Sequence, residues 1–104
     1  MGWLSKTLGS ESPGGQFYGA IMECAGTING AHQGSWSTGD LDEALQLNRS
    51  KVRELAELLT RAKGAKAVRK NISDAAWWWI KNEGWTRRQG DDFQSLMNEF
   101  CDPA

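Results

Sequence analysis

Apolar side chains recur at alternating spacings of four and three residues in the middle of the chain. This spacing places them along one side of a helix for three heptads. Asp40 and Glu43 have the spacing of a capping box, and Lys63-Gly64 is a typical helix end. The sequence therefore predicts a helix over residues 40–63. The stripe consists of Leu41, Leu45, Asn48, Val52, Leu55, Leu59 and Ala62.

Two kinds of packing would bury this stripe. Ala44, Leu47 and Leu58 widen the apolar face, as is typical of a helix in a globular core. A seam between two copies of the chain would use the same side. The pattern leaves a core seam and a dimer seam open. Either seam would use Leu41, Leu45, Val52, Leu55 and Leu59.

A second helical pattern precedes this one. Phe17, Ile21, Cys24 and Ile28 predict a helix over residues 16–29, which Asn29-Gly30 would end. Gly19 and Gly26 lie two turns apart on it and would allow another helix to approach closely. The polar residues 30–39 predict a loop around Trp36, and the Gly- and Ser-rich residues 1–15 predict a flexible arm.

The C-terminal third contains further helical segments. Residues 65–72 fit a short helix or a continuation of the preceding one, and Asn71 or Ser73 can cap a helix over residues 74–83 that ends at Gly84. The last helix has two competing caps, Thr86 with Gln89 and Asp91 with Gln94. Its apolar positions are Phe93, Leu96, Met97 and Phe100, and Asp102-Pro103 ends it.

No alternation typical of a strand persists along the chain. With 104 residues, the length fits one domain with a modest core. We therefore expect an all-α fold, a small bundle of three to five helices. Residues 16–104 would form one helical domain and residues 1–15 a flexible N-terminal arm.

Three consecutive tryptophans, Trp77 to Trp79, are followed directly by Ile80. Successive helical residues point about 100° apart, so one core cannot bury all four side chains. Tryptophan and arginine are enriched at the centres of protein interfaces. We therefore predict a protein-interaction module. Its partner-binding residues would be Trp77, Trp78, Trp79, Ile80, Trp85, Arg69, Arg87 and Arg88.

The net charge of −1 gives no general attraction to nucleic acid or membranes. Residues 61–88, however, contain eight Lys and Arg side chains against two acidic ones. Basic and aromatic residues together can bind single-stranded nucleic acid. A small nucleic-acid-binding protein that uses residues 61–88 is therefore an alternative function.

The residues capable of catalysis are few. Cys24, Cys101 and His32 lack the spacing of a metal site, and Cys24 lies on an apolar helix face. We expect no catalytic residues, no metal and no cofactor, and therefore no enzyme activity. No apolar run reaches the length of a membrane span or a signal peptide, so a cytoplasmic protein without a membrane partner is expected.

The start Met1-Gly-Trp-Leu-Ser-Lys6, the segment Ala75-Ala-Trp-Trp-Trp-Ile80 and the length together resemble the small antiactivators of quorum sensing in pseudomonads. The resemblance implies a helical homodimer without cofactor. Such a protein binds a LasR-type transcription factor of the LuxR family, and as a stoichiometric negative regulator it blocks dimerisation and DNA binding. A phage- or plasmid-encoded inhibitor or an immunity protein would share this size and composition.

Overall fold

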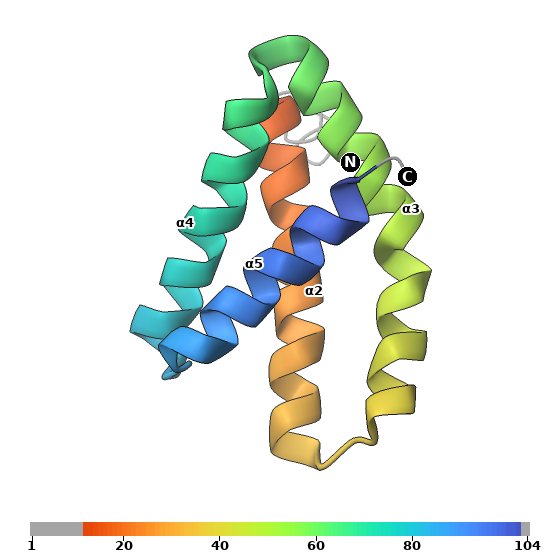
Figure 1. Ribbon diagram of the computed structural model, residues 1–104, viewed down its shortest axis with the longest axis vertical. Coiled ribbons are helices and arrows are strands. Elements are labelled where there is room, and N and C mark those ends of the chain that lie inside the picture. The colour runs from red at the N-terminus through yellow and green to blue at the C-terminus, as the bar shows by residue number, and fades with distance from the viewer. Residues whose placement is uncertain (1–11, 103–104) are drawn as a thin grey trace, which may run out of the picture.

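A computed structural model describes residues 12–102 of the chain, which form four helices (Figure 1). The helices are α2 (Pro13–Gly34), α3 (Thr38–Lys63), α4 (Ala65–Glu83) and α5 (Arg87–Cys101). The predicted all-α bundle is confirmed. Helices α2, α3 and α4 run side by side, and α5 crosses the bundle diagonally in front of α2.

Helix α2 is longer at both ends than predicted. Ser12 caps it by accepting a hydrogen bond from Gly15 N–H at 3.1 Å, and Pro13 occupies the first turn, where its missing N–H costs nothing. Residues 13–15 are therefore helical, although the prediction assigned them to the arm. Residues 1–11 of that arm lie outside the described residues.

The predicted end of this helix at Asn29-Gly30 is wrong. The helix continues to Gly34, because Ile28 and Ala31 are buried and their packing outweighs the cost of one helical glycine. Ser35, in the left-handed region at φ 59°, ends it. The predicted loop over residues 30–39 is therefore reduced to residues 35–37.

Helix α3 begins two residues earlier than predicted. Ser37 is its N-cap and accepts a hydrogen bond from Asp40 N–H at 3.1 Å. Asp40 is thus the third helical residue, and its predicted role as the cap is wrong. Serine and aspartate are equally good caps, so the sequence contained two valid start signals. The predicted end at Gly64 is confirmed.

The apolar stripe of α3 packs inside a single chain. Leu45, Val52 and Leu59 belong to the buried core, and Leu41 and Leu55 pack partly buried against it. Asn48 is half-buried and Ala62 is exposed. These side chains therefore form a core seam, and little of the stripe remains for a second copy.

Helix α4 is one continuous helix. Asn71 and Ser73 lie in its interior, so neither caps a new helix. The Asn71 side chain instead donates a hydrogen bond to the carbonyl oxygen of Gly14 at 3.0 Å, which joins α4 to the first turn of α2. Gly84 ends α4 as predicted.

Helix α5 starts at the Thr86 capping box, in which Thr86 and Gln89 exchange two hydrogen bonds. The competing cap at Asp91 is wrong. Phe93, Met97 and Phe100 are buried as the pattern predicted. At its other end, Arg53 of α3 donates a hydrogen bond to the Asp102 carbonyl oxygen at 3.2 Å.

Close helix approach occurs at a different glycine from the predicted ones. No heavy atom lies within 4 Å of where a Cβ would stand at Gly19 or Gly26, so the predicted close packing there is wrong. At the buried Gly90, such a Cβ would lie 2.7 Å from Ile80 Cδ1. Gly90 therefore allows α5 to pack tightly against α4.

Gly64 connects α3 to α4 at φ 94° and ψ 164°, a conformation that essentially only glycine adopts. We expect Gly64→Ala to lower the free energy of unfolding by about 1–3 kcal/mol. Chemical denaturation measures this change. The control is Gly26→Ala, at an open helical position, which should stabilise by about 0.5–1 kcal/mol. Equal effects of the two substitutions would contradict a conformation at Gly64 that requires glycine.

Candidate functional site

The tryptophans divide into a buried pair and an exposed pair. Trp79 and Trp85 retain only 9% and 5% of their accessible surface, whereas Trp77 and Trp78 retain 42% and 40%. Helical geometry explains the division within α4, because Trp79 shares the core-facing side with Ile72 and Ala75. Because successive helical residues are turned by about 100°, Trp77 and Trp78 point away from the core when Trp79 points into it.

The buried pair holds three helices together. The rings of Trp79 and Trp85 lie 5.3 Å apart, and Trp85 contacts Phe93 of α5 edge-on at 5.7 Å. The Trp85 indole N–H donates to Asn29 Oδ1 at 3.1 Å, and the Trp79 indole N–H points at Met22 Sδ at 3.3 Å. Trp79 and Trp85 are therefore core residues of the described chain, and little of either ring is left for the predicted partner surface.

The exposed rings are fixed by their neighbours. Trp78 stands edge-on to Trp79 at 5.2 Å. Trp77 lies under the guanidinium of Arg87 at 5.2 Å, where α5 begins. Both rings are thus held against the protein with a large part of their surface free. We call Trp77, Trp78 and Arg87 the tryptophan surface.

The remaining predicted site residues lie elsewhere. Ile80 is half-buried and packs against Gly90, so it serves the contact between α4 and α5. Arg88 is exposed at the start of α5. Arg69 lines a cleft at the other end of α4. The structure therefore leaves five of the eight predicted residues exposed, Arg69, Trp77, Trp78, Arg87 and Arg88, and brings Arg87 into contact with Trp77.

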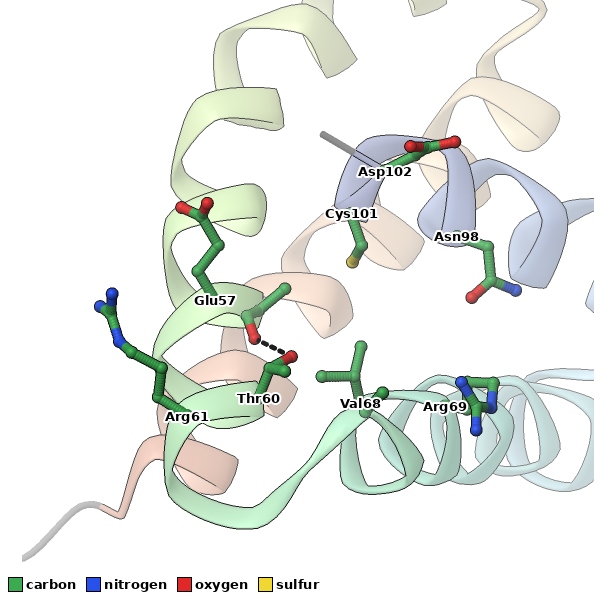
Figure 2. Close-up of a pocket in the computed structure, with 10 residues that line it drawn as sticks. Glu57, Thr60, Arg61, Val68, Arg69, Asn98, Cys101 and Asp102 are labelled. Atoms are coloured by element: carbon green, nitrogen blue, oxygen red, sulfur yellow. Dashed lines mark hydrogen bonds between the residues drawn. The ribbon is translucent and has the colours of Figure 1, made fainter. Parts of the chain in front are cut away.

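The cleft lies where α3, α4 and the end of α5 meet, and encloses about 560 Å³ (Figure 2). Val68 and Cys101 point into it, while Arg69 and Asn98 lie on its far side. Glu57 and Arg61 extend outward from α3. An apolar floor with a polar rim suits a small apolar group that carries a polar end.

The cleft has no activated nucleophile among its described residues. Burial raises the pKa of the Cys101 thiol to about 11 from its ordinary 9.0, so the thiol is neutral at physiological pH. The Thr60 hydroxyl donates to the Ala56 carbonyl oxygen at 2.8 Å. The sequence did not indicate this cleft, because the residues that line it come from three helices and form no sequence motif.

Cys24 and His32 occupy different environments. Cys24 is fully buried, and its pKa is raised to about 11, first by burial and second by the charge of Glu23, against a lowering by Lys51. His32 is exposed, with Nδ1 3.3 Å from Gln89 Nε2. Cys24 therefore serves the core, and His32 contributes to the contact between α2 and α5.

Among residues 12–102, no three His, Cys, Asp or Glu side chains group together as a metal site would require. None of the helices described there combines the length and apolarity needed to cross a membrane.

The basic residues of α4 divide between its outer side and the cleft. Spacing places Lys66, Lys70 and Lys81 on the outer side of the helix, and Arg69 lies at the cleft. Lys70 forms a salt bridge with Asp74 at 2.8 Å, and Arg87 covers Trp77. The positive charges are therefore spread out and partly engaged.

Comparison with protein-family models, curated proteins and solved structures finds no match for this chain.

The division of the tryptophans predicts different effects on stability. Trp79→Ala removes a buried ring and should lower the free energy of unfolding by about 3–5 kcal/mol. Trp77→Ala loses an exposed ring and one cation–π contact, so about 1 kcal/mol is expected. Denaturant unfolding of both variants measures the difference. Similar losses would contradict the assignment of Trp79 to the core.

The raised pKa of Cys101 predicts slow alkylation at neutral pH. The thiolate is the reactive form, so the rate with iodoacetamide should rise about tenfold per pH unit from pH 8 to about 10. Mass spectrometry distinguishes Cys101 from Cys24. The unfolded protein is the control, and its rates should level off near pH 9. The same early plateau in the folded protein would contradict a buried thiol.

Proposed function

We propose that the protein is a protein-interaction module that binds its partner through the tryptophan surface. The observation that carries the proposal is the exposure of Trp77 and Trp78, with Arg87 over the Trp77 ring, on a helix whose opposite side is well packed. Tryptophan and arginine dominate the energies of protein interfaces. No other residues of the described chain combine these two types in contact.

The free area of the two rings is large enough to matter. An exposed fraction near 40% leaves about 60–100 Å² of each ring accessible, since a tryptophan buries about 150–250 Å² in total. At about 25 cal/mol per Å², covering both rings contributes about 3–5 kcal/mol before the costs of association. That contribution suits the centre of a specific interface.

Preorganisation lowers those costs. Trp78 rests on the buried Trp79, and Trp77 is held beneath Arg87, so neither ring has to be immobilised from a free state. An interface built on preordered side chains loses less entropy on binding. These rings are therefore favoured over Trp36, which is 47% exposed on the α2–α3 connection.

The regulatory role rests on the sequence resemblance. In this proposal the protein is a stoichiometric antiactivator that binds a LuxR-family transcription factor of the LasR type. By covering the receptor's dimerisation surface, it prevents DNA binding. An apolar surface centred on two tryptophans supports this role, because dimerisation surfaces are themselves apolar.

A homodimer belongs to the same proposal. Because α3 buries its apolar stripe within the chain, a dimer would need another surface, and the tryptophan surface offers two exposed aromatic rings. Sedimentation analysis of wild type and Trp78→Ala tests this point. A dimer that the substitution converts to monomer is expected, and a dimer unaffected by it would place the contact elsewhere.

Affinity capture tests the partner proposal. Tagged wild type, Trp77→Ala, Trp78→Ala and Trp36→Ala are compared on a nuclease-treated lysate of the source cells, with mass spectrometry of the captured proteins. Wild type and Trp36→Ala should retain a transcription factor that the other two variants lose. Trp36→Ala is the matched control, because it removes a tryptophan of similar exposure from a different place.

Two results would contradict the proposal. Capture that Trp77→Ala and Trp78→Ala leave unchanged would exclude the tryptophan surface. Capture from an untreated lysate that is lost after nuclease treatment would instead favour binding by the basic residues 61–88. Circular dichroism of each variant confirms that the helices are intact.

A further inference from the structure

A groove between α2 and α3 begins at the first turn of α2, separate from the tryptophan surface. It encloses about 500 Å³, within the range of pockets that hold ligands. Its lining includes Gly15, Gly19 and Ala20 of α2 and Leu55 of α3. Leu58 borders it with 44% of its surface exposed. The groove therefore has room for an apolar segment, which would cover the exposed Leu58.

We propose that this groove is the docking site for residues 1–11 of the same chain, with Leu4 and Leu8, which share one face of an extended segment, as the docked side chains. The described chain starts at Ser12, three residues before Gly15 at the groove, and Figure 1 shows the start of α2 beside the end of α3. Gly9-Ser10 supplies residues that favour a reversal of the chain.

The length of the segment fits the groove. From Gly15 to Glu23 the groove follows α2 for about 12 Å, at a rise of about 1.5 Å per helical residue. Residues 3–8 span up to about 20 Å when extended, at about 3.3 Å per residue. After a reversal at residues 9–10, the segment can therefore cover the whole groove.

The charges of the groove also fit the segment. Glu23 forms a salt bridge with Lys51 at 3.6 Å across the groove. Glu54 of α3 also lines the groove, and it forms no salt bridge with any residue of the described part of the chain. Lys6 lies between the apolar Leu4 and Leu8 in the sequence. Docking of the two leucines would bring Lys6 near Glu54.

Covalent attachment favours this occupant over a separate protein. A short flexible connection gives a tethered segment a millimolar effective concentration. A separate peptide with the same contacts would have to reach that concentration to compete. The docking is independent of the partner bound at the tryptophan surface.

Paramagnetic relaxation in the full chain tests the docking. A nitroxide on Ser5→Cys, in a Cys101→Ser background, should broaden the amide signals of Gly19, Ala20 and Leu55. Gly39, about 24 Å along α3 from Leu55 at a rise of about 1.5 Å per residue, serves as a distant reference within the same spectrum. Gly19→Leu fills the groove and should restore the broadened signals of Ala20 and Leu55. Gly26→Leu places the same side chain at an open glycine of the same helix outside the groove lining, and should leave the broadening intact.

Three results would overturn the proposal. The first is no broadening at the groove in the full chain. The second is equal broadening in Gly19→Leu and Gly26→Leu, which would place the segment elsewhere. The third is broadening that persists when the nitroxide and the ¹⁵N label are on different chains, because the occupant would then be a second copy. Lys6→Glu provides a further check and should weaken the broadening severalfold.

Discussion

The stacked pair of Trp79 and Trp85 is the contact on which the remaining arrangement depends. One ring comes from α4 and the other from the three-residue connection to α5, and Trp85 also meets Phe93 of α5. The two indole N–H groups point at Asn29 and Met22, both in α2. Large buried rings with satisfied N–H groups bring much apolar area without a desolvation penalty. This pair fixes α4 and α5 against α2, and thereby sets the direction in which Trp77 and Trp78 point. Trp77 and Trp78 are exposed because the next residue in the sequence, Trp79, occupies the buried side of α4.

Glycine has two distinct uses in this chain. Gly64 and Gly84 adopt positive φ and end helices, and Gly90 allows α4 and α5 to approach. Gly19 and Gly26 have no neighbour that a Cβ would touch. They cost helix stability without improving packing among the described residues. On the same side of α2, Gly15 and Gly19 leave room for a groove that a helix rich in larger residues would fill.

Local signals in the sequence predicted the helices well and their ends less well. The α3 stripe, the Thr86 capping box and the stops at Gly64 and Gly84 depend on neighbouring residues, so their patterns were readable. The ends of α2 and the start of α3 were misplaced, because Ser12, Ser37 and Asp40 offer similar caps and burial of Ala31 decided the outcome. Burial of one tryptophan in three was not predictable, since it depends on where α2 and α5 pack. The cleft and the groove were missed for the same reason, because each joins residues far apart in the chain.

The most direct test of the account is the solvent exposure of each indole N–H, measured by NMR with a soluble gadolinium chelate, without and with the captured partner. In the free protein, diluted until it is monomeric, the account predicts strong relaxation of Trp36, Trp77 and Trp78 and weak relaxation of Trp79 and Trp85. Binding should protect Trp77 and Trp78 while Trp36 stays exposed. Protection of Trp36, or no change at Trp77 and Trp78, would contradict a partner interface built on the tryptophan surface.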